Sequence, residues 1–342
     1  MKKLLCTMLA VVLVFSLYAC GSQQSSDTQK VGEISNSNAA AGNVTNSAAV
    51  NNASEPFSAE NTSENNNASG NAGAVDEDAV FKVGDILKDK DMQIVYISSG
   101  VYHSDNSFMQ PKEGNQYIFL KFAFTNLSKK DDSVSTYSFE AYADGFACEA
   151  FYGGDDDLSA TLSSGRTETG CVYFEVPKDA KDIEIEYEPN IFSDRKVKFI
   201  YEGDRDSGYV PIPVTTRTEG AYSAGDIIEG KGYRITYVSA EPFAGSMFEQ
   251  PHAGCSFITI TLEFENTSSS DRSVTSLSFD AYADGLACRQ VFTRDDDLSA
   301  TISAGRKARG TVTFEIPTNA SVVEYEFSES FWTSGRVIFT VR

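Results

Sequence analysis

Residues 257–264 read FITITLEF, and residues 117–124 read YIFLKFAF. In the first stretch apolar and polar residues alternate, which is the pattern of a β-strand with one buried face. In the second stretch aromatic residues stand on both faces and blur the alternation. Comparing the two stretches predicts which side chains face the core. They are Ile118, Leu120, Phe122 and Phe124, with Ile258, Ile260, Leu262 and Phe264.

The two stretches belong to one module that is written twice along the chain. Residues 155–166 read DDDLSATLSSGR, and residues 295–306, which lie 140 positions later, read DDDLSATISAGR. Between residues 139–177 and 279–317, 23 of 39 positions are identical, so identity between the copies need not indicate function. Each module of about 120 residues is long enough to bury its own core.

Other stretches of both modules alternate in the same way. The expected strands of the first copy are 80–87, 92–98, 117–126, 135–143, 147–151, 169–176, 183–187 and 197–201. The further residues expected inside are Val172, Phe174, Val176, Ile183, Ile185, Tyr187, Val197, Phe199 and Tyr201, with Val312, Phe314, Ile316, Val323, Tyr325, Phe327, Val337, Phe339 and Val341. The intervening Glu184, Glu186, Glu324 and Glu326 are expected to face water.

Turn residues complete the prediction of fold class. Asp144-Gly145 and Asp284-Gly285 each separate two short apolar stretches, which is a strong hairpin signal. No segment shows a convincing helical period. The sequence therefore predicts an all-β protein, with two tandem antiparallel β-sandwiches after a disordered tether. The expected divisions are 1–19 (signal peptide), 20–79 (tether), 80–202 (first sandwich), 203–223 (Pro-containing connector) and 224–342 (second sandwich).

The first 20 residues predict the location. Lys2 and Lys3 precede an apolar run, Leu4–Leu17, which has the length of a signal-peptide core and is too short for a confident membrane span. The ending Leu17-Tyr18-Ala19-Cys20 resembles the lipobox of bacterial lipoproteins. It implies that Cys20 becomes a lipidated (palmitate-type) first residue, anchored at the outer face of the cell membrane. The alternative is an ordinary secretory signal with a cysteine by chance.

Composition and charge narrow the classes of partner. Residues 21–79 are dominated by Ser, Asn, Ala and Gly and cannot bury enough apolar surface to offset their ordering entropy, so they are expected to form a flexible tether. The net charge is −21, from 28 basic and 49 acidic residues. An acidic surface argues against nucleic acid and against anionic lipid headgroups. Cationic partners, metal ions or simple solubility remain.

Four cysteines lie in the two modules. Cys148 and Cys288 occupy equivalent positions, whereas their companions Cys171 and Cys255 do not. In an extracellular protein this arrangement predicts one disulfide in each module. The alternative is buried free thiols. Zinc is not expected, because the four sulfurs lack paired ligand spacing.

A set of short motifs in both modules carries a resemblance to a known family. Each module has an Asn that ends a long apolar strand, Asn126 or Asn266, and a strand that ends in Phe-Glu-Val-Pro (174–177) or Phe-Glu-Ile-Pro (314–317). The layout resembles the immunoglobulin-like domain-of-unknown-function family of Gram-positive surface lipoproteins. That family is similar in fold to the secreted mycobacterial immunoprotective antigen. The resemblance implies an extracellular immunoglobulin-like sandwich and transfers no catalytic residue.

Catalytic motifs are absent from the sequence. The only histidines, His103 and His252, do not occupy equivalent positions, and no nucleophile elbow, zinc-protease motif or phosphate-binding glycine loop occurs. The sequence therefore predicts a non-catalytic protein without a resident cofactor.

The acidic loops are one candidate site. Asp155, Asp156 and Asp157, like Asp295, Asp296 and Asp297, crowd three carboxylates together, which is unfavourable unless a cation relieves the repulsion. Calcium prefers such oxygen ligands, although the EF-hand pattern is absent. The alternative is a solvated turn in which Arg166 or Arg306 is the partner.

Two apolar pairs form the second candidate. Ile191 and Phe192, and at the equivalent positions Phe331 and Trp332, lie between the last two expected strands. They form either an exposed docking patch or a lid that folds onto the core.

Two functions follow from these patterns. The favoured one is a non-catalytic surface lipoprotein whose modules bind an extracellular protein, peptide or wall component, with avidity if both copies engage. The alternative is a structural or accessory envelope lipoprotein without a ligand of its own, whose modules calcium would stabilise.

Overall fold

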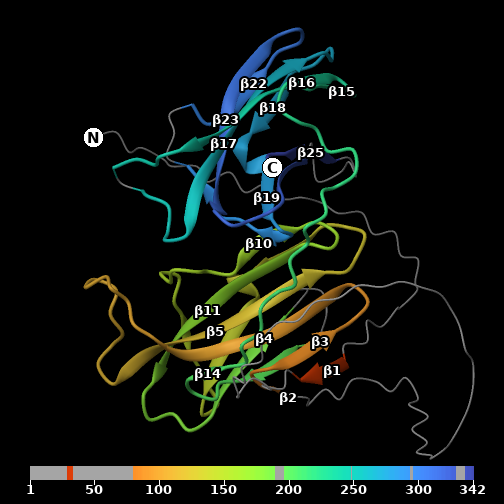
Figure 1. Cartoon of the computed structure of the whole chain (residues 1–342). Helices are drawn as coiled ribbons and strands as arrows, with labels where there is room; N and C mark the ends of the chain where they lie inside the picture. Colours follow the sequence, from red (N-terminus) through yellow and green to blue (C-terminus); the bar gives the residue numbers. More distant parts are fainter. Residues whose placement is uncertain (1–28, 34–79, 189–195, 248, 293–295, 329–335) are drawn as a thin grey trace, which may run out of the picture.

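The computed structural model describes residues 29–33, 80–188, 196–247, 249–292, 296–328 and 336–342. Apart from two short 3-10 turns, η1 (Thr136–Ser138) and η2 (Ser276–Ser278), the regular structure of these residues is all strand. Figure 1 shows two β-sandwiches, one above the other. The all-β prediction with tandem sandwiches is therefore confirmed. Within the described ranges, no helix is long and apolar enough to cross a bilayer.

The first module packs two sheets against each other. One sheet has the order β3 (Asp85–Lys88), β4 (Met92–Tyr102), β5 (Asn115–Asn126) and β11 (Thr167–Pro177), with β14 (Arg205–Asp206) on β4 and β9 (Glu149–Ala150) on β11. The other has the order β2 (Val80–Phe81), β13 (Val197–Ile200), β12 (Ile183–Tyr187), β7 (Phe139–Ala143) and β8 (Phe146–Ala147). A small ribbon pairs β6 (Asp132–Ser135) with β10 (Ser159–Leu162).

The second module repeats this plan. Its first sheet has the order β15 (Ile227–Gly230), β16 (Tyr233–Phe243), β17 (Cys255–Asn266), β23 (Lys307–Pro317) and β21 (Gln290–Val291). Its second has the order β20 (Leu286–Ala287), β19 (Phe279–Ala283), β24 (Val323–Ser328) and β25 (Arg336–Thr340). The ribbon consists of β18 (Arg272–Thr275) and β22 (Ser299–Ile302).

One strand lies inside the range expected to be a tether. β1 (Gln29–Glu33) pairs antiparallel with the edge strand β3. This short strand lies within the expected tether, and it forms because the free edge of β3 offers backbone groups to an extended segment that reaches it.

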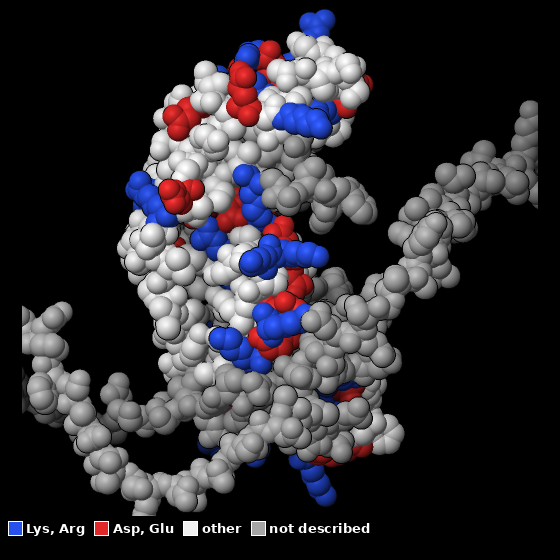
Figure 2. Space-filling model, turned by 90° about the vertical axis from the view of Figure 1, so that its right-hand side faces the viewer, with Lys and Arg blue, Asp and Glu red and all other residues white. Residues whose placement is uncertain are grey.

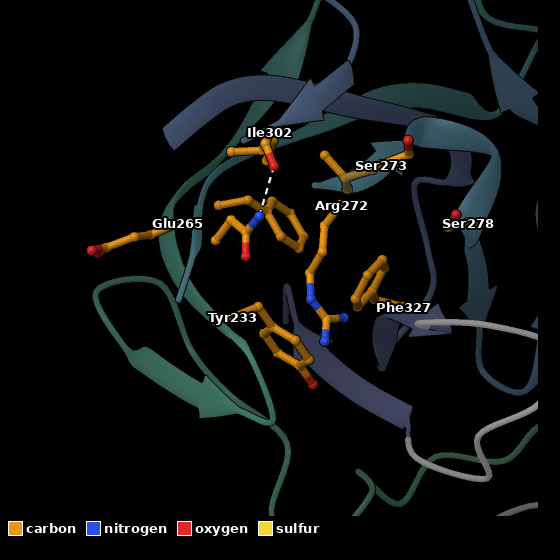
Figure 3. Close-up of a pocket in the computed structure, with 10 residues that line it drawn as sticks. Tyr233, Glu265, Arg272, Ser273, Ser278, Ile302 and Phe327 are labelled. Atoms are coloured by element: carbon orange, nitrogen blue, oxygen red, sulfur yellow. Dashed lines mark hydrogen bonds between the residues drawn. The ribbon is translucent and has the colours of Figure 1, made fainter. Parts of the chain in front are cut away.

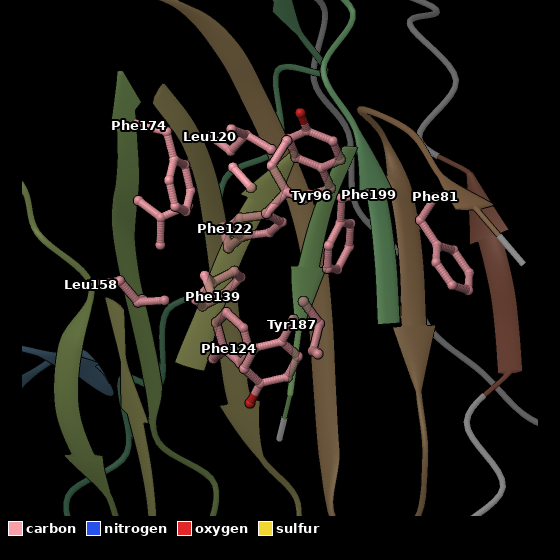
Figure 4. Close-up of a cluster of buried hydrophobic side chains, with 14 of the residues drawn as sticks. Phe81, Tyr96, Leu120, Phe122, Phe124, Phe139, Leu158, Phe174, Tyr187 and Phe199 are labelled. Carbon is pink, nitrogen blue, oxygen red and sulfur yellow. The ribbon is translucent and has the colours of Figure 1, made fainter. Parts of the chain in front are cut away.

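The core of the first module lies between its two sheets and is mostly aromatic (Figure 4). Phe122 is central: its ring centroid lies 4.8 Å from that of Phe199, 4.9 Å from that of Tyr96 and 5.4 Å from that of Phe139. Such contacts add to the stabilisation from apolar burial. In both modules the residues of β5, β11 and β12, and of β17, β23 and β24, that were expected inside are buried, which confirms the predicted faces.

The Asp-Gly hairpins form as the sequence predicts. Asp144 and Gly145 have φ values of 49° and 84°, and Asp284 and Gly285 repeat them. Positive φ at both central residues is what a type I′ turn requires, and glycine adopts it without steric cost. The turns join β7 to β8 and β19 to β20.

A buried asparagine ties each ribbon to the end of the long strand. Asn266 is 1% exposed, and its Nδ2 donates to the carbonyl oxygens of Ser270 and Ile302, both at 2.7 Å. Its Oδ1 accepts from the backbone N–H of Ser268 at 2.9 Å. Asn126 makes the equivalent bonds in the first module. The asparagine that the family motif contains therefore has a structural role.

We expect Asn266→Ala to lower the free energy of unfolding of the second module by about 2–4 kcal/mol, because it deletes four side-chain hydrogen bonds, among them the buried one to the carbonyl of Ile302. Urea denaturation measures the change. Asn319→Ala, at an exposed turn position, is the matched control and should have little effect. Equal effects of the two variants would contradict the role assigned to Asn266.

Candidate functional site

The two modules meet through their backbones. Thr167, at the start of β11, pairs in parallel with Leu286 of β20, and its N–H donates to the carbonyl of Gly285 at 3.0 Å. A sheet of the first module therefore continues into a sheet of the second. The contact lies midway along the molecule in Figure 1.

A buried arginine crosses this contact. The Arg166 Nη2 donates to Glu324 Oε2 and to Glu326 Oε1, both at 2.7 Å, and its Nε donates to Glu326 Oε1 at 3.1 Å. Its guanidinium carbon also lies 4.5 Å from the ring centroid of Tyr282. Glu324 and Glu326 are 0% and 2% exposed. The prediction that they face water is wrong, because the first module covers that face of β24.

Further bonds surround this ion cluster. Tyr282 Oη donates to the carbonyl of Thr161 at 2.8 Å and accepts from the backbone N–H of Ser163 at 3.3 Å. Arg336 of β25 forms ion pairs with Glu326 and with Asp131 of the first module. The contact between modules thus combines opposite charges with fixed backbone partners, which confers specificity in register.

The pKa values at the cluster follow from burial and pairing. Burial acts to lower the pKa of Arg166, but Glu326 and Glu324 outweigh it and the pKa is raised. Burial acts to raise the pKa of Glu324, but the bonds from Arg166 and Thr218 outweigh it and the pKa is lowered. Arg166 and Glu324 are therefore held in their charged forms.

The connector packs against the second module. The backbone N–H of Val214 donates to the carbonyl of Asp284 at 2.7 Å. The N–H and hydroxyl of Thr218 donate to the two carboxylate oxygens of Glu324, at 2.6 and 2.9 Å. The segment between the modules is therefore part of their contact.

The acidic loops have a structural role. Asp156 Oδ2 lies 2.8 Å from Lys121 Nζ, and the carbonyl of Asp156 accepts from the N–H of Cys171 at 2.6 Å. Leu158, which follows the acidic residues, is fully buried, and Gly170 opposite it has no room for a Cβ because one would lie 2.7 Å from Leu158 Cα. The loop is thus anchored to β11.

Calcium binding is one of the two alternatives that the sequence leaves open for Asp155, Asp156 and Asp157. Among the residues that the structure describes, no group of three His, Cys, Asp or Glu side chains could hold a metal. The solvated-turn alternative fits better, although the partner is Lys121 and not Arg166. In the second copy Asp295 lies outside the described residues, while Asp296 accepts a hydrogen bond from the Thr311 hydroxyl at 3.2 Å.

The predicted disulfides are wrong, because Cys148, Cys171, Cys255 and Cys288 are all free thiols. Cys148 and Cys288 pack against the cores of their modules. Cys171 neighbours the core residue Val172 on β11, and Cys255 stands at an odd position of β17, whose even positions are in the core. Successive side chains of a strand point to opposite faces, so each predicted pair is separated by a sheet. Burial raises the pKa of Cys171 to about 11, which makes it unreactive.

A small pocket opens at the end of the second module (Figure 3). Its volume is ≈ 240 Å³. Its apolar lining consists of buried side chains, and polar side chains complete it. The lining residues are Tyr233, Phe264, Glu265, Asn266, Arg272, Ser273, Val274, Ser278, Ile302 and Phe327.

Arg272 brings a positive charge to this pocket. Figure 3 shows its side chain between the rings of Tyr233 and Phe327, whose centroids lie 6.5 Å apart. Its Nη2 donates to the carbonyl of Lys231 at 3.0 Å. The first module has Asp132 at the equivalent position, where burial above all raises the carboxyl pKa. The two copies therefore carry opposite charges at this point.

The two apolar pairs, for which the sequence leaves a docking patch or a lid on the core open, cannot be examined in the structure. Ile191, Phe192, Phe331 and Trp332 lie outside the described residues. In sequence, Phe327 of the pocket comes shortly before the second pair. The sequence does not predict the pocket, because its lining residues alternate as ordinary core residues do. The change from Asp132 to Arg272 between the copies is the one signal that could have indicated it.

Charges on the visible surface are mixed. On the face shown in Figure 2, Lys and Arg side chains lie among Asp and Glu side chains and do not form a patch of one sign. Ion pairs such as Lys307 with Glu263 at 2.9 Å and Arg234 with Glu229 at 2.7 Å join opposite charges among the described residues.

Comparison with known proteins gives the family. Residues 81–197 and 225–338 each match the model of a family described as a domain of unknown function, DUF4352. The chain belongs to the DUF4352 family. The two matches correspond to the two sandwiches, and they confirm the resemblance drawn from the short motifs. No curated protein matches the chain in sequence.

Solved structures similar to this DUF4352 protein share low sequence identity with it. A lipoprotein candidate of Bacillus subtilis, ycdA, is 16% identical with a TM-score of 0.29, over 33% of this chain and 37% of its own. The yjhA protein of the same species is 13% identical with a TM-score of 0.29, over 35% and 99%. The secreted protein MPT63 of Mycobacterium tuberculosis is 16% identical with a TM-score of 0.29, over 36% and 96%.

We expect Arg166→Met to destabilise the contact between the DUF4352 modules by about 3–5 kcal/mol, because two buried carboxylates lose their main partner. Urea denaturation and proteolysis of the connector measure this loss. The equivalent Arg306→Met replaces an exposed arginine and should change the free energy of unfolding by less than about 0.5 kcal/mol. If both variants behave alike at low protein concentration, the ion cluster does not couple the modules.

A second prediction concerns pH. Burial raises the pKa of Asp280 from 3.8 to about 6; Arg336 opposes this rise, and Glu326 and Asp131 add to it. Because the folded state holds this proton more tightly, the stability that Asp280 contributes is present below pH 3.8 and is lost as the pH rises through about 6. Asp280→Asn should therefore unfold at higher temperature than the parent protein at pH 7, with a gain of about 1–2 kcal/mol, and match it below pH 4.

The control is Glu140→Gln at the equivalent position of the first module. Lys196 and Tyr142 lower the pKa of Glu140, so neutralising it removes a favourable charge. Thermal unfolding of this variant should show no gain at pH 7. A stabilised Glu140→Gln, or an Asp280→Asn protein without gain, would contradict the prediction.

Proposed function

We propose that this protein is a non-catalytic lipoprotein at the outer face of the membrane, whose two sandwiches form one rigid unit that binds a segment of an extracellular protein or peptide. The lipobox-like end of the signal segment supports an anchor at Cys20. The family match supports the tandem sandwiches, and the non-catalytic part of the proposal rests on the lack of known catalytic motifs in the sequence. The single observation that carries the binding role is the pocket of the second module.

The size of the pocket indicates the kind of ligand. At ≈ 240 Å³ it is smaller than the roughly 300–1,000 Å³ of pockets that enclose a whole small molecule. It has room for one or two side chains of a peptide. Phe264, Val274 and Ile302 are 4–6% exposed and provide an apolar floor for such a side chain.

The charge of the pocket indicates what stands beside that side chain. The guanidinium of Arg272 lies in the pocket and presents a planar set of donors that suits a carboxylate. We therefore expect the bound segment to place an acidic residue, or a C-terminal carboxylate, next to an apolar side chain. The acidic surface of this protein repels segments that carry only acidic residues, whereas Arg272 attracts one carboxylate at the pocket. The pocket would therefore favour a segment with a single acidic group beside an apolar side chain.

A second candidate is an accessory role in the envelope without a ligand. The buried ion cluster supports it, because a rigid pair of modules is what a spacer requires. The two roles differ in whether the pocket has an occupant.

Selection of phage-displayed random peptides on the full chain tests the proposal. We expect peptides with an apolar residue beside a carboxylate, and we expect Ser278→Trp, which fills the pocket, to reduce their affinity at least tenfold. Ser138→Trp, at the equivalent position of the first module, is the matched control and should bind normally. If no peptide is selected, or if Ser278→Trp binds as tightly as the parent protein, the accessory role is favoured.

A further inference from the structure

Each module carries both halves of the contact that joins the modules. Within one chain, the first module provides Arg166 from the turn between β10 and β11, which we call the tip. The second module receives it on the outer side of β19 and β24, which we call the face and which carries Tyr282, Glu324 and Glu326. The tip of the second module and the equivalent face of the first are not used in this contact. The positions correspond at a spacing of 140 residues: Arg166 with Arg306, Asp131 with Asp271, Tyr282 with Tyr142, Glu324 with Glu184, Glu326 with Glu186 and Arg336 with Lys196.

The unused tip of the second module and the unused face of the first module therefore have the same kinds of charged and aromatic residues as the contact within the chain. All six pairs are identical except for the change from Arg336 to Lys196, which keeps the charge. Arg306 is exposed, whereas Arg166 is buried. The side chains of Glu184 and Glu186 are 31% and 16% exposed, whereas Glu324 and Glu326 are buried.

The unused face of the first module also contains a hollow. Tyr142, Gly145, Asp182, Glu184 and Glu186 line a hollow of ≈ 240 Å³. In the second module the equivalent of this surface receives the Arg166 side chain. A hollow with two glutamates and a tyrosine fits a guanidinium in charge and in shape.

Backbone groups at this face are available as well. Within the described residues β8 is an end strand of its sheet, and its Phe146 is 78% exposed. In the second module the equivalent strand, β20, is paired with β11 and its Leu286 is partly covered. The start of β23, at Lys307, corresponds to the Thr167 that makes this pairing.

We propose that the free tip of the second module docks on the free face of the first module of another copy of this chain. Arg306 enters the hollow between Glu184 and Glu186 and lies against Tyr142, and the start of β23 pairs with β8. The contact is head to tail, so it leaves one unused half at each end and produces an open row of chains.

This contact is weaker than its counterpart within the chain, for two reasons. Lys198 pairs with Glu184 at 3.2 Å, and this exposed ion pair must rearrange. The intermolecular contact also lacks the connector, which brings Thr218 to Glu324 and provides a high effective concentration. Association therefore depends on protein concentration and is favoured where chains share a membrane surface.

The proposed association between chains does not involve the pocket of the second module. Asp131, Asp132 and Ser133 of the first module stay exposed while the second module is docked there. An occupied pocket and a docked copy are therefore compatible, and Ser278→Trp should leave the association unchanged.

Sedimentation velocity of the full chain in detergent tests the proposal with two complementary variants. Arg306→Glu damages only the tip, and the double variant Glu184→Gln, Glu186→Gln damages only the face without offering a positive charge to the altered tip. We expect the parent protein to form a concentration-dependent series of species and each variant alone to be monomeric. An equimolar mixture of the two variants should form a two-chain species, because one undamaged tip meets one undamaged face.

Arg309→Glu is the control, since it makes the same charge change at an exposed position of β23 outside the contact, and it should associate as the parent protein does. Thermal unfolding curves verify that every variant is folded. A parent protein that is monomeric at all concentrations, an Arg306→Glu protein that still associates, or a mixture that stays monomeric would each overturn the proposal.

Discussion

The guanidinium of Arg166, buried against Glu324 and Glu326, determines how the two modules of this protein are arranged. A charge removed from water is tolerated only where opposite charges and hydrogen-bond partners surround it. That requirement permits one position of the modules, the one in which Tyr282 also reaches Thr161. The shared sheet and the packed connector follow from this position, and together they turn two similar domains into one unit.

Duplication gave both modules the same residues but different surroundings. Arg166 is buried and Arg306 is exposed, although they end the same motif. The same holds for Glu324 and Glu184. At the contact between modules the charge of each ionic group is the same in both copies, whereas at the pocket Asp132 of the first copy is replaced by Arg272. Retention at the contact and change at the pocket are consistent with one surface for assembly and another for a ligand.

Much of the fold could be predicted from period-two alternation and turn residues. The faces of β5 and β17 and the hairpin at Asp284-Gly285 were predicted correctly, because a strand with one buried face has to alternate and a type I′ turn requires positive φ. The candidate site was predicted poorly. Alternation places Glu324 and Glu326 on the outer face of their sheet, but it carries no information about another domain that covers this face. Cysteine counting likewise ignores that Cys148 and Cys171 lie on opposite sides of a sheet.

The sequence by itself determined that this chain contains two β-sandwiches, which of their side chains form the cores, and that each contains the acidic stretch from which the duplication is visible. These properties depend on local periodicity and on backbone angles, which neighbouring residues decide. Only the tertiary structure decided what the acidic residues do: Asp156 pairs with Lys121, and Glu324 and Glu326 hold Arg166. The energy of a charge depends on what surrounds it in space, and that environment comes from residues up to 160 positions away.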